Sequence, residues 1–153
     1  MKALIELETR ALLEAQGYKN VPFIFGSALK AVEAVANGDL AGTLARVRSL
    51  LTDEGRLFID IVDLRAAYLR QWSIEGAIKI DHPYYLTQDT MTAYLLRAGF
   101  EILRADYAAD HLHVSYVCRP GAVRPDALPT SASVDQLLRE IRFVQNAPRP
   151  GAA

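Results

Sequence analysis

Two patterns of hydrophobic residues alternate along the chain, and together they predict its elements. Apolar residues spaced three or four apart predict helices over residues 3–16, 28–35, 40–51, 87–97 and 133–144. Short continuous apolar runs predict strands over residues 21–25, 56–62, 101–107 and 112–118. Strands that alternate with helices are typical of a parallel sheet joined by right-handed crossovers, so the pattern predicts an α/β fold.

The last two predicted strands break this alternation. Their only link is the tetrapeptide Ala108-Ala109-Asp110-His111. A link this short permits a hairpin but not a parallel crossover. We therefore expect a mostly parallel, Rossmann-like sheet with a C-terminal antiparallel hairpin, flanked by helices.

The chain after the hairpin predicts one further helix. Residues 119–132 are rich in proline and glycine and are expected to form a linker between a domain at 1–118 and a helix at 133–145. One face of that helix carries Val134, Leu137, Leu138 and Ile141. Ser131 or Ser133 is expected to be its N-cap, and residues 146–153 a disordered tail.

Composition narrows the class of protein. At 153 residues, with 51% hydrophobic and 23% charged residues and a net charge of −1, the chain suits one folded domain and gives no sign of a nucleic-acid-binding surface. It contains no apolar run of the roughly 18 to 20 residues that span a bilayer, and its acidic start argues against a secretory signal. We therefore expect no membrane partner. The single cysteine, Cys118, excludes an internal disulfide, which fits a reducing cytoplasm.

Asp81 and His82 are the strongest candidates for catalysis. They follow the predicted strand that ends at Asp63 and lie in the connection where open parallel sheets place ligands. An imidazole oriented by a carboxylate can remove a proton from a hydroxyl or amine. The alternative is that Asp81-His82-Pro83 is a turn whose polar side chains cap the helix near Thr87.

A group of aromatic residues is the candidate for substrate binding. These residues are Tyr68, Trp72, Tyr84 and Tyr85. Aromatic walls with a few polar tips suit small organic substrates, although such residues more often cover a core. Asp60 and Asp63, at the end of a strand, could bind a substrate amine or could accept hydrogen bonds from neighbouring loop amides.

Two further groups of residues raise chemical questions. On a strand, the two-residue period would place His111 and His113 on the same face, beside Asp110, so two metal ligands could lie together. No third ligand is identifiable nearby, and we predict no metal site. A solvent-exposed hairpin tip is the simpler interpretation. Cys118 has no base close in sequence, which favours a buried, unreactive thiol over a nucleophile.

Between residues 21 and 118 the order of these motifs resembles the class I S-adenosylmethionine-dependent methyltransferases. The similar segments are Leu44-Ala45-Arg46-Val47-Arg48-Ser49-Leu50-Leu51, the turn Thr52-Asp53-Glu54-Gly55, the strand Arg56–Val62 with Asp63, His82-Pro83-Tyr84-Tyr85-Leu86-Thr87, the helix Thr90–Leu96, and Ala98-Gly99-Phe100. The resemblance implies S-adenosylmethionine as cofactor, a small-molecule methyl acceptor, and Gly26-Ser27 as a loop that faces the cofactor.

The chain departs from this family where the family holds its cofactor. A Gly-x-Gly loop and a following acid, which approach the donor closely and bind its ribose, have no counterpart in the sequence. We therefore expect a protein that is incomplete or inactive alone, with an apolar edge at residues 21–25 that pairs with a second copy or with a missing half. A non-catalytic binding or dimerisation module is the alternative.

Residues 4–33 also resemble the end of the GTP-binding domain of translation elongation factor Tu. The similar segments are residues 4–13, Gly17-Tyr18, Pro22-Phe23-Ile24 and Gly26-Ser27-Ala28-Leu29-Lys30-Ala31. The phosphate loop and the base-reading Asn-Lys-x-Asp motif of such GTPases are absent from the sequence, so GTPase activity is not expected.

Overall fold

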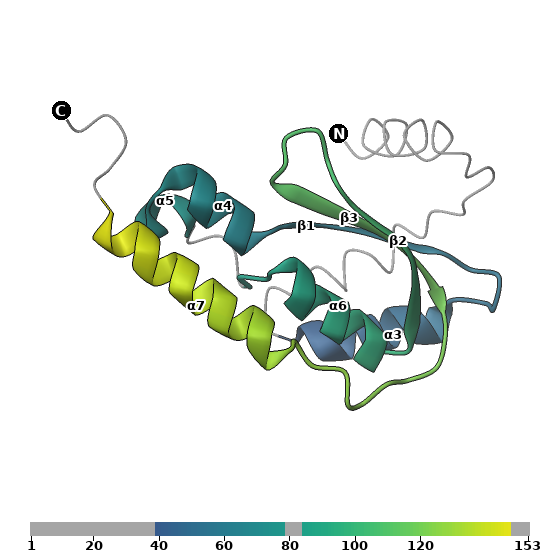
Figure 1. Cartoon of the computed structure of the whole chain (residues 1–153). Coiled ribbons are helices and arrows are strands. Elements are labelled where there is room, and N and C mark those ends of the chain that lie inside the picture. Colours follow the sequence, from purple (N-terminus) through teal and green to yellow (C-terminus); the bar gives the residue numbers. More distant parts are fainter. Residues whose placement is uncertain (1–38, 79–83, 148–153) are drawn as a thin grey trace. The chain divides into compact units, whose positions relative to one another are not determined.

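The computed structural model describes residues 39–78 and 84–147. In these ranges it forms a mixed α/β structure of five helices and three strands (Figure 1). The helices are α3 (Leu40–Leu50), α4 (Leu64–Gln71), α5 (Ile74–Ala77), α6 (Gln88–Arg97) and α7 (Ser131–Asn146), and the strands are β1 (Leu57–Val62), β2 (Phe100–Tyr107) and β3 (His113–Pro120). The elements predicted before residue 39, Gly26 and Ser27, the apolar edge at 21–25, and Asp81 and His82 lie outside the described residues.

The three strands form one sheet in the order β1-β3-β2, and both neighbouring pairs are antiparallel. The register pairs Leu57 with Cys118 on one side of β3 and Tyr107 with Val114 on the other. The predicted C-terminal hairpin is thus confirmed. The mostly parallel sheet is not seen among the described strands, because β3 lies between β1 and β2, which run in the same direction without being neighbours.

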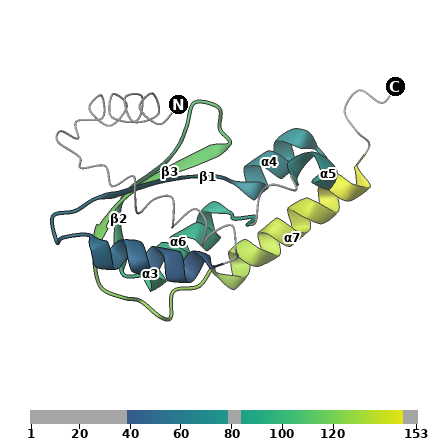
Figure 2. The ribbon, with the colours of Figure 1, turned by 180° about the vertical axis from the view of Figure 1, so that it is seen from behind.

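Helices α3 and α6 pack against one face of this sheet (Figures 1 and 2). Alternate residues of β3 point toward them, as the two-residue period of a strand requires. The buried core consists of Leu40, Leu44, Met91, Leu95, Phe100, Val114, Tyr116 and Cys118. The Tyr116 hydroxyl, although inside this core, donates to the Gln88 carbonyl oxygen at 2.9 Å, so its polar atom is paired.

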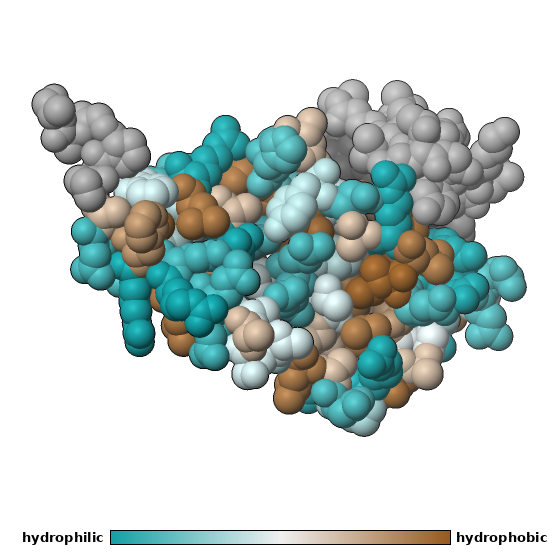
Figure 3. All heavy atoms as spheres, in the orientation of Figure 1, coloured by the Kyte–Doolittle hydropathy of each residue, from teal (hydrophilic) through white to brown (hydrophobic). Residues whose placement is uncertain are grey.

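The opposite face of the sheet carries polar pairs. The Ser115 hydroxyl donates to Asp60 at 2.8 Å across β3 and β1, and Arg119 makes two hydrogen bonds of 2.8 Å with Glu101 across β3 and β2. Asp60, Glu101 and Arg119 are exposed and Ser115 is half-buried. On the surface of the molecule that Figure 3 shows, hydrophilic and hydrophobic residues mix. Val117, which lies between Ser115 and Arg119 on this face of β3, is 4% exposed, so the face is not polar throughout.

Helix α4 was not expected, because the segment after Asp63 was interpreted as a connection. Its N-cap is Asp63, whose side chain accepts from the backbone N–H groups of Arg65 and Ala66 at 2.8 and 3.4 Å. Capping of this kind satisfies N–H groups that have no partner within the helix. The strand-ending acid is therefore also the start of a helix.

Helix α7 begins earlier than predicted and is only partly covered. Thr130, and not Ser131 or Ser133, is its N-cap, with the Thr130 side chain accepting from Ser133 N–H at 3.1 Å. On the face predicted to be apolar, Val134 and Leu138 remain 44% and 45% exposed. The helix is attached to α4 through polar contacts described below.

Gly99 closes α6 with a left-handed backbone, at φ 81°. Replacing it with alanine would strain that conformation and place a Cβ 3.1 Å from Cγ2 of Val123. We expect Gly99→Ala to lower the free energy of unfolding by about 1–2 kcal/mol, measured by urea denaturation. Gly99→Asn is the matched control: its Cβ meets the same neighbour, but asparagine tolerates the backbone better, so it should cost less. Equal losses in the two variants would mean that crowding, and not φ, is responsible.

Candidate functional site

Polar side chains from all three strands gather at one edge of the sheet. Asp63 follows β1, Tyr107 ends β2, and His113 begins β3, with Asp110 in the turn before it. Because β1 and β2 run in the same direction and β3 opposes them, their carboxyl ends and the start of β3 meet there. Open α/β sheets place ligands at the carboxyl ends of strands, so we take these four residues, here named the carboxyl edge, as the candidate site.

Asp63 is the buried acid of the carboxyl edge, at 1% exposure. One oxygen, Oδ1, accepts the two α4 amides, and the other, Oδ2, accepts a hydrogen bond from the Tyr107 hydroxyl. Its backbone N–H donates to the Leu112 carbonyl at 2.9 Å, which extends the β1–β3 pairing by one residue. Both carboxylate oxygens therefore serve the fold, which is the alternative that the sequence left open for this acid.

Tyr107 was not singled out by the sequence. Partial burial of a residue that is 39% exposed, the hydrogen bond to Asp63 and the negative charge of that carboxylate raise the pKa of the Tyr107 phenol above its ordinary value, and Arg65 opposes this in part. The hydroxyl therefore stays protonated over the physiological range and acts as a donor. Its position as the last residue of β2 was the only available signal.

A second polar pair extends the carboxyl edge toward helix α7. Arg65, in the first turn of α4, contacts both carboxylate oxygens of Glu140 on α7, at 2.6 and 2.7 Å. The two partners shift each other as opposite charges do: the pKa of Arg65 is raised and that of Glu140 is lowered, mainly by their shared hydrogen bonds. One turn further along α4, the Tyr68 hydroxyl donates to the Ile141 carbonyl of α7 at 2.9 Å. These contacts hold α7 against α4.

Asp110 and His113 form a carboxylate–imidazole pair at the hairpin turn. Asp110 Oδ2 lies 2.5 Å from His113 Nδ1, and Oδ1 accepts from the backbone N–H groups of Leu112 and His113 at 2.9 and 3.1 Å. These amide hydrogen bonds, and then the imidazole, hold the Asp110 pKa far below its ordinary value. The carboxylate therefore stays charged and both shapes the turn and orients the ring.

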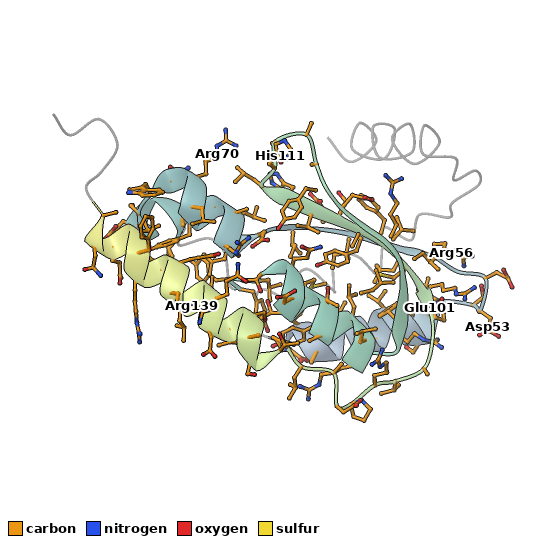
Figure 4. The ribbon with its side chains drawn as sticks, in the orientation of Figure 1. Asp53, Arg56, Arg70, Glu101, His111 and Arg139 are labelled. Carbon is orange, nitrogen blue, oxygen red and sulfur yellow. The ribbon has the colours of Figure 1, made fainter. Side chains whose placement is uncertain are left out.

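His111 does not share a strand face with His113, and it lies exposed in the hairpin turn, as the simpler interpretation predicted. The turn places His111 before β3 with a left-handed backbone, at φ 56°. Figure 4 shows His111 at the hairpin tip on the same side as Arg70 of α4, and Arg70 donates to the Asp110 carbonyl at 3.1 Å. In the described part of the chain, no three His, Cys, Asp or Glu side chains are grouped as a metal site requires.

The four predicted aromatic residues are not brought together. Tyr84 accepts a hydrogen bond at its hydroxyl from Leu40 N–H, 2.8 Å away, and so supports the start of α3, whereas Tyr85 is 39% exposed. Tyr68 and Trp72 do meet at one cavity of about 170 Å³ between α4, α5 and the end of α7. Neither Tyr84 nor Tyr85 lines this cavity.

A second cavity, of about 330 Å³, lies between α6 and the loop that precedes α7. Ala93 and Leu96 of α6 face Arg124 and Leu128 of the loop across it. Backbone hydrogen bonds fix the loop, from Gly121 N–H to the Gly99 carbonyl at 2.8 Å and from Arg124 N–H to the Leu96 carbonyl at 3.0 Å. None of the predicted site residues lines this cavity.

Cys118 is buried in the core, as predicted, and burial raises its pKa from 9.0 to about 12. A thiol in this state forms little thiolate at neutral pH.

We expect the native protein to react with a thiol reagent such as 5,5′-dithiobis(2-nitrobenzoate) at least 100 times more slowly than the urea-unfolded chain, with the reaction followed by absorbance at 412 nm. Because the unfolded thiol ionises near pH 9 and the folded one near 12, the Cys118 contribution to stability should be complete below pH 9 and fall as pH rises toward 12. Rapid native labelling would contradict the burial.

The comparisons with known proteins give no relative for this chain. No family model, no curated protein and no solved structure matches it. Among the helices of the described residues, none has both the length and the apolar character to cross a membrane.

Proposed function

We propose that this chain is a methyltransferase-family protein, related to the enzymes that transfer a methyl group from S-adenosylmethionine to a small molecule, and that it is incomplete or inactive alone. The observation that carries the proposal is the sheet itself. Strands β1 and β2 run in the same direction on either side of α6 in the chain, and only the final strand reverses. The resemblance of residues 21–118 implies a mixed sheet that ends in an antiparallel hairpin. The described strands contain the hairpin and two strands of common direction, but no parallel neighbours.

The described residues do not fit the methyl donor. Asp63, the buried acid at the carboxyl edge, has both oxygens engaged, and neither cavity is lined by an edge residue. The sequence also holds no Gly-x-Gly loop. Under the proposal, Gly26-Ser27 faces the donor and Asp81-His82 supplies the base in a cytoplasmic protein, with no catalytic step assigned to them. Tyr84, Tyr85 and Trp72, predicted to contact the acceptor, do not form one acceptor site among the described residues.

A non-catalytic binding module is the second candidate, and one specific observation favours it. The polar residues of the carboxyl edge bind one another: Tyr107 donates to Asp63, and Asp110 orients His113. Side chains that are used this way stabilise a surface and are not held ready for a substrate. A module of this kind would keep the fold and have no affinity for the donor.

Calorimetric titration of the full chain separates the two candidates. We would titrate S-adenosylmethionine and S-adenosylhomocysteine, with ATP as a control that shares the adenosine moiety. Saturable binding of the two methionine-derived ligands at micromolar concentration, with ATP silent, supports the methyltransferase proposal. Silence of all three at millimolar ligand shows that this chain does not hold the donor by itself and supports the module, whereas equal binding of ATP indicates a general adenosine site.

A further inference from the structure

Trp72 combines three features that its role in packing does not explain. It ends α4 with a left-handed backbone, at φ 53° and ψ 25°, where a bulky side chain is rarely found. Its indole N–H is buried and has no hydrogen-bond partner, alone among buried side-chain polar atoms of the described residues. It also lines the cavity of about 170 Å³. A strained backbone and an unpaired buried donor are both unfavourable, and both occur in Trp72, a residue that lines a cavity.

We propose that this cavity binds a small, neutral, single-ring molecule with one hydrogen-bond acceptor, and that the acceptor pairs with the indole N–H of Trp72. The cavity lies at the opposite end of α4 from Asp63, so the inference does not depend on the proposed function.

The size and lining of the cavity determine the ligand class. A cavity of about 150 Å³ holds benzene in a well-studied protein, so a volume of about 170 Å³ is enough for a single ring, here in a partly open cavity whose lining has polar as well as apolar atoms. Tyr68, Ile74, Val144 and Ala147 offer aromatic and aliphatic contacts. Glu75 also lines the cavity, and a carboxylate there disfavours an anionic ligand. A neutral ring with an acceptor meets all three conditions.

The N–H is covered, so the ligand reaches it only when the indole turns. Phe143 packs against the Trp72 ring in an edge-to-face arrangement, with ring centroids 5.8 Å apart. Phe143 is 63% exposed, so few contacts resist its displacement. Pairing the N–H with an acceptor removes the cost of an unsatisfied buried donor, and this gain drives the rotation.

The test compares pyridine with benzene, which have the same shape and differ in the acceptor. Both are titrated at pH 8, where pyridine is neutral, and binding is followed by ¹⁵N–¹H correlation spectra of the full chain. Trp72 is the single tryptophan, so one indole N–H signal reports on the site. We expect pyridine to move this signal downfield and benzene not to do so.

A variant pair completes the test. Trp72→Phe keeps a ring and removes the donor, so the ratio of pyridine to benzene affinity should fall at least ten-fold relative to the parent protein. The hydration of each ligand is the same in both proteins and cancels from this comparison. Ala147→Leu narrows the cavity and should weaken both ligands at least ten-fold in a protein that retains Trp72. The proposal is overturned if neither ligand binds at 10 mM, if the indole signal stays unmoved by pyridine, or if the affinity ratio is unchanged in Trp72→Phe. If that variant does not fold, the indole signal and Ala147→Leu decide the question.

Discussion

Leu95→Ala should lower the free energy of unfolding by about 3 kcal/mol, within the 2–5 kcal/mol that such core truncations cost. Leu95 lies on the buried side of α6 and is 0% exposed. It belongs to the cluster that joins α6 to α3 and to the sheet, where it packs with Met91 and Phe100. Alanine keeps the helix, so the loss comes from missing contacts and a cavity, both of which urea denaturation followed by far-UV circular dichroism would report.

Leu138→Ala is the matched control, because it is the same substitution on another helix. Leu138 is 45% exposed on α7, so its truncation should cost less than 1 kcal/mol. The difference between the two variants measures burial alone, since helix propensity changes equally. If Leu95→Ala cost no more than Leu138→Ala, the cluster under the sheet would not be the core of the protein.

The sequence predicted those elements whose signals are local. Helix α6 is bounded by Thr87, which caps it, and by Gly99, and the observed helix differs from the predicted one by a single residue at its start. The β2–β3 hairpin followed from the shortness of its link. The neighbours of each strand were harder to predict, because the position of β3 between β1 and β2 depends on contacts far apart in sequence.

The candidate site was predicted less well than the fold. Asp63 was recognised as a strand-ending acid, but the same aspartate before Leu64-Arg65-Ala66-Ala67 is an N-cap signal, and this interpretation would have predicted α4. The contact between Tyr107 and Asp63 joins residues 44 positions apart, so no local pattern reveals it. A shared strand face for His111 and His113 required the strand to include His111. In the structure His111 lies in the hairpin turn, with a positive φ of 56°, so the alternation of strand side chains does not apply to it.

Asp63→Ala should lower the free energy of unfolding by about 2–3 kcal/mol. The carboxylate caps α4 through Arg65 and Ala66, and loss of a cap costs about 0.5–2 kcal/mol. The substitution also removes the acceptor of the Tyr107 hydroxyl, which must then turn to solvent, and leaves space at a site that is 1% exposed. Urea denaturation measures the loss, and amide hydrogen exchange should show faster exchange in the first turn of α4.

Two variants separate these contributions. Asp60→Ala removes an exposed acid of β1 and should cost at most about 0.5 kcal/mol, since the partner of Asp60 within the described residues is the surface side chain Ser115. Tyr107→Phe tests the hydroxyl alone: it should destabilise the parent protein by about 1 kcal/mol and the Asp63→Ala protein hardly at all, because the acceptor is already gone. An equal cost of Tyr107→Phe in both backgrounds would show that the two residues are not coupled, and Asp63 would then act only as the cap of α4.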